Sequence, residues 1–430
     1  MVLSAEAADR VEISVIIPSM NEALNLNLLL PALKETLDAL GVRYEILVVD
    51  KASPDGTEQV VTAAGARYIC ETQSGYGAAL LRGIREARGE YLITMDADLS
   101  HPAKFIRDLW AARDQADILI ASRYVPGGRA DQPLVRYLLS CVLNAFFRSA
   151  LSINVRDMSS GYRLYHKSVF RNIQPQFSNF VVLVEILLEA LRRGRRFAEV
   201  PFHYQSRGEG RSHAKVVQFG LDYLRLFFRM WRTRNSIDFP DYDWRAHDSR
   251  IPLQRYWQRR RHALILGFTP PGIATLDIGC GSSRILADLP NAVGVDLRHE
   301  KLTFMKRVNR KLVQADGCVL PFDEAAFDCA ICSEVIEHIP DEGGRMLDEL
   351  TRVLRPGGTL IIGTPDYGNW QWRLTERLYH LAAPGAYADE HVTHYTRDSL
   401  TRALRARGYE ILDHAYILKG ELIIKARRQS

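Results

Sequence analysis

The sequence predicts an α/β protein with two doubly wound domains in one chain. Two separate series of short apolar strands alternate with helical stretches, which is typical of mainly parallel sheets covered by helices. The chain has 430 residues, and a single hydrophobic core usually stops growing at about 250–300 residues. We therefore expect one domain over residues 11–234, a connector over 235–262 and a second domain over 263–430.

Each series is defined by its β-rich apolar runs. In the first they are ISVIIP, YEILVVD, YLITMDAD and ADILIAS, with a helix expected over residues 27–40. In the second they are TLDIG, AVGVD, KLVQAD, FDCAICS and TLIIGT, and Pro356-Gly357-Gly358 predicts a turn before the last strand. The segment between the two series loses this periodicity, gains Asp, Pro and Trp, and ends in a run of charge. We interpret that segment as the connector.

The charge and the apolar segments restrict the partners and the location. A net charge of +5 is too mild for a dedicated nucleic-acid binder, but it suits attraction to nucleotide diphosphates and anionic lipid head groups. The first ten residues lack a basic segment followed by an apolar one, so no secretion signal is expected. The longest apolar stretch, residues 137–153, is shorter than the roughly 20 residues of a membrane-spanning helix. We expect a cytoplasmic protein without transmembrane helices.

Residues 136–151 and 216–232 combine apolar and basic side chains at helical spacing. Helices of this kind can lie on a membrane with their arginines toward the lipid head groups. They can equally pack on the sheet or between domains. Peripheral contact with the cytoplasmic membrane face is therefore one of two interpretations that the pattern allows.

Cys329 and Cys332 have the spacing of a metal-binding pair, but no second Cys or His pair accompanies them. The run FDCAIC instead predicts a buried strand. We interpret both cysteines as core residues.

Two carboxylates follow a predicted strand of the first domain. In the run YLITMDADLS, Asp96 and Asp98 are two positions apart, so an extended backbone directs both side chains toward one cation. A divalent ion there, Mg²⁺ or Mn²⁺, would neutralise the charge that builds on a leaving nucleoside diphosphate. The pattern favours glycosyl transfer from a nucleotide sugar.

The motif order extends this interpretation. SVIIPSMNE, VVDKASPDGT and GYGAALLRGIREARGEYLITMDADLSHPAKF together resemble the A-fold inverting glycosyltransferases of family 2, and within them the dolichyl- and polyprenyl-phosphate sugar synthases, over residues 11–234. The resemblance implies that Pro18, Asn21 and Glu22 line the nucleotide pocket, Asp50 contacts the base, and Asp96 and Asp98 bind diphosphate and metal. The family usually has a second acid where this chain has Lys51. The donor base, uridine or guanosine, therefore stays open.

Later motifs of the first domain follow the same subgroup: ASRYVPGG, LVRYLLS, DMSSGYRLY and RGEGRS. The resemblance implies that Arg123, Arg136 and Ser140 hold the acceptor phosphate, and that Arg207 and Ser212 belong to a loop closing near the active site. A phosphate monoester is already anionic at neutral pH, so it needs arginine forks more than a general base. The subgroup commonly has Ser-Lys where this chain has Ser212-His213.

The second domain opens with a glycine-containing turn, LDIGCGSS, after an apolar strand. Gly279 and Gly281 would let the backbone approach a nucleoside or carboxylate closely. Asp296 lies nineteen residues after Asp277 and ends the strand AVGVD, where an acid receives the hydroxyls of a cofactor ribose. Ser283 stands where a third glycine is common, and these residues alone fit a nicotinamide dinucleotide as well.

Downstream motifs favour another cofactor. VQADGCVLPF, FDCAICSEVIEHI and RVLRPGGTLIIGTP resemble class I S-adenosylmethionine methyltransferases in content and order, over residues 275–427. The resemblance implies that Asp277, Gly279 and Gly281 cradle the methionine end, Asp296 binds the ribose and Asp316 contacts the adenine amine. Glu334, a further cofactor-binding residue, and His338 begin the loop and helix that follow. The resemblance also places His391 and His394 on the substrate side. Both are candidate bases for deprotonating an acceptor hydroxyl, although a structural role for the pair is equally open.

These motifs predict a bifunctional enzyme. One half transfers a sugar from a GDP- or UDP-sugar to a polyprenyl phosphate or lipid-linked acceptor, and the other methylates a hydroxyl with S-adenosyl-L-methionine. Glycosyl transfer to a saccharide or secondary-metabolite hydroxyl is the alternative, as is a chain in which one half is only a binding module. We expect both halves to act on one cell-envelope or lipid-linked glycan pathway, because fusion raises the effective concentration of one site near the other's product.

Overall fold

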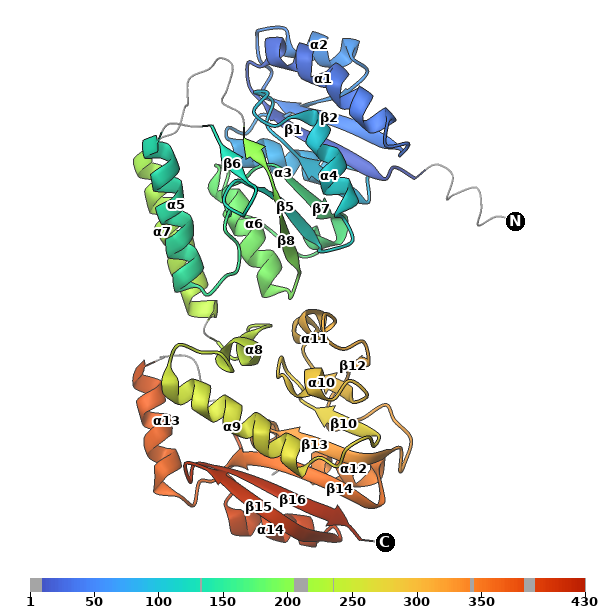
Figure 1. Ribbon diagram of the computed structural model, residues 1–430, viewed down its shortest axis with the longest axis vertical. Coiled ribbons are helices and arrows are strands. Elements are labelled where there is room, and N and C mark those ends of the chain that lie inside the picture. Colours follow the sequence, from blue (N-terminus) through green and yellow to red (C-terminus); the bar gives the residue numbers. More distant parts are fainter. Residues whose placement is uncertain are drawn as a thin grey trace, which may run out of the picture. The chain divides into compact units, whose positions relative to one another are not determined.

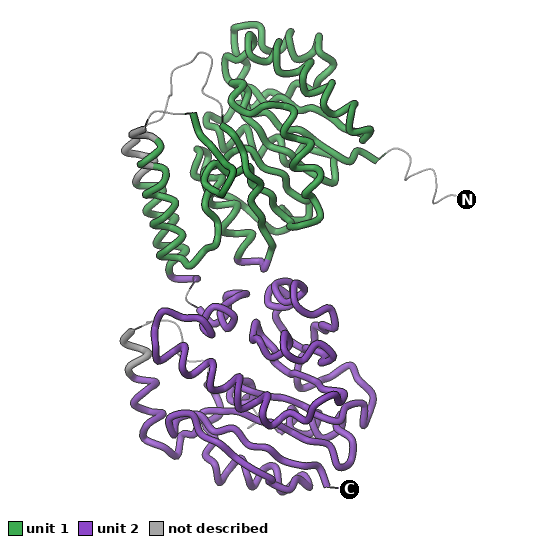
Figure 2. The backbone as a smooth tube through the Cα atoms, in the orientation of Figure 1, with its two compact units in different colours: residues 1–191, 195–231 green, residues 192–194, 232–430 purple. Residues whose placement is uncertain are grey.

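The computed structural model describes residues 10–131, 134–204, 216–234, 236–340, 344–382 and 391–429, without the side chains of residues 134–136, 139, 216–220 and 378–382. The chain forms two compact units (Figures 1 and 2). Unit 1 comprises residues 1–191 and 195–231, and unit 2 comprises residues 192–194 and 232–430.

Unit 1 is a mixed sheet with helices on its faces, as Figure 1 shows. The strand order is β3-β2-β1-β4-β7-β5-β8, in which β7 alone is antiparallel to its neighbours. The strands are β1 (Ile13–Ser19), β2 (Tyr44–Asp50), β3 (Arg67–Cys70), β4 (Tyr91–Thr94), β5 (Ile118–Ser122), β6 (Arg129–Ala130), β7 (Arg163–His166), β8 (Phe197–Pro201) and β9 (His203–Tyr204). The helices are α1 (Ala23–Asp38), α2 (Thr57–Ala63), α3 (Tyr76–Glu86), α4 (Ile106–Ala111), α5 (Leu134–Ala150), α6 (Val181–Arg192) and α7 (Val216–Arg234), with short 3-10 turns η2 (Ala103–Phe105) and η3 (Lys167–Phe170).

The central strands of unit 1 form because they are continuous apolar runs buried on both sides. Every residue of β1 and β5 is buried. Leucines of α1 at helical spacing cover one face, whereas Leu47, Val49 and Ile69 pack with Ala79 of α3 on the other. Gly83 of α3 permits this contact, since a Cβ there would lie 2.3 Å from a methyl group of Ile16.

Unit 2 has a second mixed sheet of order β12-β11-β10-β13-β14-β16-β15. Its strands are β10 (Thr275–Ile278), β11 (Val293–Asp296), β12 (Leu312–Gln314), β13 (Phe327–Ser333), β14 (Leu354–Pro365), β15 (Tyr409–Ile417) and β16 (Glu421–Arg428). Its helices are α8 (Tyr242–Ala246), α9 (Pro252–Phe268), α10 (Ile285–Asp288), α11 (His299–Met305), α12 (Gly344–Val353), α13 (Trp370–Ala382) and α14 (Arg397–Arg405), with a 3-10 turn η4 (Ile336–His338).

The last strands distinguish this sheet from the all-parallel order 3-2-1-4-5-6 of dinucleotide-binding folds. β16 inserts between β14 and β15 and runs antiparallel to both. The expected turn at Pro356-Gly357-Gly358 lies within β14, where Leu354 pairs with Phe327 and the next registered pair is Thr359 with Cys329. The three turn residues are thus an irregularity in the strand, which the positive φ of Gly357 (79°) permits.

The residues expected as a connector are largely helical and belong to unit 2. α8 and most of α9 lie within residues 235–262. Trp257 and Arg261 of α9 donate hydrogen bonds to the buried carboxylate of Glu421 on β16, at 2.6 and 2.7 Å for Arg261. The charge run that marked the segment as irregular therefore contains side chains that fasten it to the second sheet.

Two further expectations concern the apolar segments. Cys329 and Cys332 are buried in β13, and burial raises the pKa of both thiols, as expected for core residues. Of the helices in the described part of the chain, none combines the length and apolar character needed to traverse a bilayer.

Candidate active sites

The carboxyl ends of β1, β2 and β4 bring the polar residues of unit 1 to one edge of the sheet. Ser19 is registered opposite Asp50, and Met95 donates its backbone N–H to Ile16, so the three strands end at a similar level. In an open α/β sheet, ligands bind beyond the carboxyl ends of the strands, near the point where the strand order reverses. The residues expected to bind nucleotide and metal lie in the last positions of these strands or directly after them.

The acidic pair follows β4 and is held by a neighbouring histidine. The backbone N–H of Asp96 donates to Nδ1 of His101 at 2.9 Å, and His101 stacks on Tyr162. The carboxylate of Asp98 accepts hydrogen bonds from Ser100. Oδ1 of Asp96 is buried and accepts no hydrogen bond of standard geometry from the described residues. A buried carboxylate oxygen whose hydrogen bonding is incomplete fits a cation, so the pair suits a divalent metal. His101 was not singled out from the sequence, which carries no local signal for its role.

The predicted nucleotide-binding residues lie in loops tied together by side chains. The carboxylate of Asp50 accepts from the backbone N–H and hydroxyl of Ser53 at 2.7 and 2.8 Å. Ser53 in turn accepts from the N–H of Asn21 at 2.8 Å, where φ is positive (58°). Pro18 lies in β1, and Glu22 accepts from Asn25. Asp50 is thus engaged within the protein, and its described role is to fix the loop after β2.

Arg123 follows β5 and forms a buried ion pair. Its Nε and Nη2 donate to the two carboxylate oxygens of Asp157, both at 2.7 Å, and Nη2 also donates to Ser159. Burial opposes its charge, but the fully buried Asp157 carboxylate outweighs this effect and raises the pKa of the guanidinium. An acceptor phosphate would have to share this guanidinium with Asp157.

The structure describes only some of the other residues that were predicted to bind the acceptor. Ser140 is half-buried on α5, four residues before Asn144, whose side chain accepts from the backbone of Met158 at 3.0 Å. Arg136 lies in α5 but its side chain is not among those described, and Arg207 and Ser212 lie outside the described residues.

Sequence reasoning missed Arg163, which organises the segment between α5 and β7. Arg163 is fully buried and donates to the backbone carbonyls of Met158, Ser160 and Leu183 at 2.6–2.8 Å. That segment includes Gly161, where a Cβ would lie 3.4 Å from Oδ1 of Asp96. An arginine directly before Leu164 and Tyr165 in the short strand RLYH was the available signal.

In unit 2 the glycine turn follows β10 as expected. Gly279 and Gly281 have positive φ (64° and 53°), and a Cβ at Gly279 would lie 2.2 Å from a methyl carbon of Val335. The N–H of Gly281 donates to one oxygen of Asp296 and that of Arg298 donates to the other, both at 2.8 Å. The turn and the carboxyl end of β11 are therefore locked together.

Carboxylates crowd this turn. Asp277 is buried, its Oδ2 accepts no hydrogen bond of standard geometry from the described residues, and burial with the nearby Asp296 charge raises its pKa to about 8. Glu334 has a positive φ (57°), and burial raises its pKa well above its usual value although Arg261 lies 3.1 Å away. Asp316 is exposed and accepts from the N–H of Cys318. The buried acids suit a ligand that carries positive charge.

The expected connector contributes one further acid to the turn. Asp243 of α8 accepts from the N–H and hydroxyl of Ser282 at 3.2 and 3.1 Å, and Lys301 lies 3.6 Å away. A Cβ at Gly281 would lie 2.8 Å from its Oδ2. Nothing in the local sequence indicated this contact, which spans 39 residues.

The two candidate bases lie against Tyr367. The Tyr367 hydroxyl is 2.8 Å from Nδ1 of His391 and donates to Glu376 at 3.0 Å, while His394 stacks on the Tyr367 ring with centroids 4.0 Å apart. Burial, with His338 and His394 adding, lowers the pKa of His391 to about 4. His391 is therefore neutral at physiological pH and a weak base, whereas His394 is exposed.

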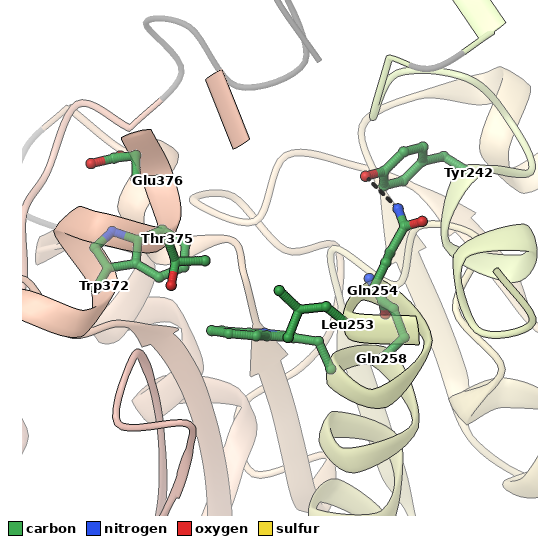
Figure 3. A pocket seen from close by; sticks show the side chains of 8 residues that line it. Tyr242, Leu253, Gln254, Gln258, Trp372, Thr375 and Glu376 are labelled. Atoms are coloured by element: carbon green, nitrogen blue, oxygen red, sulfur yellow. Dashed lines mark hydrogen bonds between the residues drawn. The ribbon is translucent and has the colours of Figure 1, made fainter. Parts of the chain in front are cut away.

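A small apolar cavity of about 80 Å³ adjoins these side chains (Figure 3). Tyr242, Leu253 and Gln254 of α8 and α9 line it on one side, and Trp372 and Glu376 of α13 on the other, as Figure 3 shows. Glu376 is also 3.8 Å from Nδ1 of His391. The cavity thus opens beside the candidate bases and offers a place for part of an acceptor.

Comparisons with known proteins agree with the two-unit arrangement. The model of glycosyl transferase family 2 matches residues 14–174, and that of a methyltransferase domain matches residues 276–362. The dolichol-phosphate mannosyltransferase of Saccharomyces cerevisiae is 31% identical over 51% of this chain and 93% of its own length. The undecaprenyl-phosphate mannosyltransferase of Micrococcus luteus is 32% identical over 46% of this chain and 85% of its own length. The chain therefore belongs to glycosyl transferase family 2 and carries a methyltransferase domain in its second half.

Other similarities are more partial. A dolichol-phosphate mannosyltransferase of Pyrococcus furiosus is 34% identical over 53% of this chain, but the chain spans only 66% of that protein's length. Among solved structures, a glucosyl-3-phosphoglycerate synthase from Mycobacterium tuberculosis is 20% identical over 54% of this chain and 82% of its own, with a TM-score of 0.42. An S-adenosylmethionine-dependent methyltransferase from Methanosarcina mazei is 21% identical over 39% of this chain and 97% of its own, with a TM-score of 0.31.

Proposed function

We propose that unit 1 transfers a sugar, as a hexosyl group, from a nucleotide sugar to a polyprenyl phosphate, and that unit 2 methylates a hydroxyl with S-adenosylmethionine. The observation that carries the first activity is that β1, β2 and β4, the last of which leads into the acidic pair, end at the same edge of the sheet. The relatives named for polyprenyl- and dolichol-phosphate mannosyl transfer support the acceptor class. The crowded carboxylates around the glycine turn support a cationic cofactor in unit 2.

In unit 1, Asp96 and Asp98 would hold Mg²⁺ or Mn²⁺, because hard oxygen ligands suit both ions. Such an ion stabilises the negative charge on a departing nucleoside diphosphate. His101 fixes the backbone at Asp96, and the buried Oδ1 of Asp96 accepts no hydrogen bond of standard geometry from the described residues. The loop held by Asp50 and Ser53 would seat the nucleoside.

The acceptor supplies its own anionic oxygen, so unit 1 needs cationic side chains more than a base. We assign Arg136 and Ser140 of α5 to the acceptor phosphate, with Arg207 and Ser212 on a closing loop. Because Arg123 is bound bidentately by Asp157, its main contribution is to position the segment after β5. The part of the guanidinium that does not contact Asp157 would in addition contact the acceptor phosphate.

The outer face of α5 and α7 favours a lipid acceptor. Phe147 and Phe227 pack between the two helices, with ring centroids 5.6 Å apart, whereas large apolar side chains on the same helices are exposed: Leu138, Val142, Phe146, Leu221, Leu224, Phe228 and Trp231. Arg148 and Arg225 are exposed nearby. An exposed apolar surface with flanking cations suits the head-group region of an anionic membrane. We therefore place the acceptor's membrane at this face.

In unit 2, the methionine part of the cofactor would be bound by Asp277, Gly279 and Gly281. Asp296 would bind its ribose and Asp316 its adenine. Glu334 would lie on the side of its sulfonium group. The cofactor supplies a methyl group on a positively charged sulfur. Carboxylates that repel one another in the absence of a cation, such as Asp277 and Asp296, gain favourable interactions when that charge enters.

The test uses the full-length chain with GDP- and UDP-sugars, Mg²⁺ or Mn²⁺ and a short polyprenyl phosphate, with products identified by mass spectrometry. Formation of a polyprenyl-phosphate sugar supports unit 1's assignment, and transfer only to free saccharides contradicts it. Calorimetry with S-adenosylmethionine tests unit 2 separately. Lack of cofactor binding would leave unit 2 as a scaffolding module.

A matched pair of surface variants tests the membrane face. Phe228→Glu should reduce binding to vesicles that contain anionic lipid, because a charge replaces an exposed apolar side chain. Tyr256→Glu places the same charge on exposed α9 of unit 2 and is the control. Equal binding of both variants would remove the lipid assignment from α5 and α7.

A further inference from the structure

Glu337, His338 and His391 form a compact cluster of potential metal ligands in unit 2. One ligand atom of each residue lies within 4.8 Å of those of the other two. Ligand atoms bound to one ion at about 2.0–2.2 Å lie at most about 4.4 Å apart, so a small side-chain adjustment brings all three onto one ion. The first two residues belong to η4, which follows β13, and the third precedes α14.

Backbone hydrogen bonds fasten these two segments together. The N–H groups of Val392 and Thr393 both donate to the carbonyl of Glu337 at 3.0 Å. The hydroxyl of Thr393 donates to the carbonyl of Ile339 at 2.6 Å. The ligand atoms are therefore brought together by the fold and do not depend on a chance side-chain arrangement.

The carboxylate of Glu337 gives an independent reason to expect a cation. Glu337 is fully buried, and its Oε2 accepts one hydrogen bond, from Thr364 at 3.1 Å. Its Oε1 is buried and accepts no hydrogen bond of standard geometry from the described residues. Because a buried carboxylate is costly unless it is paired or binds a metal, this oxygen needs a positive partner.

The hydroxyl of Tyr367 helps to orient the imidazole of His391. Nδ1 of His391 is 2.8 Å from the Tyr367 hydroxyl, whose single proton is donated to Glu376. A partner on one ring nitrogen fixes the rotation of the imidazole and the tautomer offered on the other side, as is usual for metal-binding histidines. The rings of His338 and His391 lie edge to face, with 5.1 Å between their centroids and an angle of 61° between their planes.

The cluster lies between the two places where substrates are expected. On one side, Val335 packs against Gly279 of the glycine turn. On the other, Trp372 and Glu376 line the cavity in Figure 3, and the Trp372 ring is 6.1 Å from that of His391. A group bound at the cluster would thus lie between the cofactor turn and the acceptor cavity.

We propose that Glu337, His338 and His391 bind a divalent transition metal ion that holds and polarises the hydroxyl of the methyl acceptor. This inference rests on the proposed methyltransferase function. Two imidazoles and one carboxylate suit Zn²⁺, Fe²⁺, Co²⁺ or Ni²⁺ more than Mg²⁺. Three protein ligands leave further positions open, which is the arrangement of a catalytic ion.

The proposed methyl transfer needs only the metal ion, the acceptor, S-adenosylmethionine and His394. The cation lowers the pKa of the acceptor hydroxyl, whose proton passes to the exposed His394. The oxygen–methyl bond forms as the sulfur–methyl bond breaks, and the electron pair of the broken bond stays on sulfur, which becomes neutral. His391 is then a ligand, and His394 alone is the proton acceptor.

Titration with Co²⁺ alone tests the site without reference to activity. The full-length chain carries Asp96→Asn and Asp98→Asn, so that the acidic pair of unit 1 does not compete. We expect one Co²⁺ per chain, with visible absorption bands of nitrogen and oxygen ligation. Glu337→Gln, His338→Ala and His391→Ala should each weaken binding at least tenfold, whereas His299→Ala, an exposed histidine of α11, should not. Binding that is indifferent to all three ligand variants would overturn the proposal.

Two further readouts separate the metal site from the proposed function. Calorimetry with S-adenosylmethionine on the same variants should give unchanged cofactor affinity, which also shows that they fold. If the parent chain binds Co²⁺ through these residues but no cofactor, the methyltransferase assignment fails and the metal site stands. Catechol, a simple hydroxyl chelator, should shift the Co²⁺ bands by occupying open positions. Bands that do not respond would overturn the acceptor role.

Discussion

The two candidate sites of this chain surround their carboxylates in different ways. In unit 1 most charged groups near the acidic pair already have partners: Asp50 binds Ser53, Asp98 binds Ser100, and Arg123 is paired with Asp157. In unit 2 the acids around the glycine turn repel one another, and the pKa of Asp277 rises to about 8 as a result of burial and this repulsion.

The difference follows from the charge of the expected ligands. A nucleotide sugar is an anion, so the carboxylates of unit 1 are useful only if a divalent cation bridges them to the diphosphate. S-adenosylmethionine carries its own positive sulfur and ammonium, so the carboxylates of unit 2 can attract the cofactor without a bridging metal ion. The same residue type would thus serve two ligands of opposite charge. We expect donor turnover to require a divalent cation, whereas binding of S-adenosylmethionine itself should not.

The largest expected effect is the loss of donor turnover in Asp98→Asn. Removing one carboxylate of the pair should lower turnover about 10²–10³-fold, because charge on the leaving diphosphate is no longer compensated. S-adenosylmethionine affinity should be unchanged, as unit 2 contains none of these residues. Release of nucleoside diphosphate and calorimetry measure the two quantities. Loss of both would mean that the variant unfolds.

Arg123→Ala tests whether Arg123 contacts the acceptor or positions neighbouring residues of unit 1. The change leaves the fully buried Asp157 carboxylate without its partner, which should cost about 3–5 kcal/mol of stability in urea unfolding. Arg136→Ala should instead raise the KM for polyprenyl phosphate with little change in stability. If Arg123→Ala were as stable as the parent and affected only acceptor use, Arg123 would be an acceptor contact and not a positioning residue.

Asp296→Ala should weaken cofactor binding about 10–100-fold. The carboxylate would bind the ribose hydroxyls, and it also holds the backbone N–H of Gly281, so both contributions are lost. The dissociation constant from calorimetry checks this, with Asp413→Ala on exposed β15 as the control. An unaltered constant would place the ribose elsewhere.

The smallest effect is a proton released on cofactor binding. With a pKa of about 8, Asp277 is mostly protonated at pH 7, and an entering cation should ionise it. Calorimetry in buffers of different ionisation enthalpy should detect close to one proton released, and none in Asp277→Asn. An equal count in both proteins would show that the cofactor's charge lies elsewhere.

The raised pKa of Asp277 also determines the direction in which stability changes with pH. The folded pKa of Asp277 lies above its unfolded value of about 3.9. Its contribution to stability is therefore complete below pH 3.9 and is lost as the pH rises through 8. Without cofactor, the thermal midpoint of Asp277→Asn should fall less than that of the parent between pH 6 and 9.

Sequence alone determined the features that depend on neighbours along the chain. The apolar runs defined strands such as β1 and β13, and the positions of Asp96 and Asp296 at strand ends followed from them. The glycine turn was also readable, because only glycine tolerates the positive φ and the contact at Gly279. These features arise from local backbone preferences and side-chain periodicity, which any short window of sequence contains.

Only the tertiary structure decided which distant groups meet. Asp157 pairs with Arg123 across 34 residues, and Asp243 reaches Ser282 from a segment that had looked like a linker. The cluster of Glu337, His338 and His391 likewise exists because two segments far apart in sequence share backbone hydrogen bonds. Such contacts result from the packing of whole elements, and their cost in chain entropy is met by buried surface that no local pattern records.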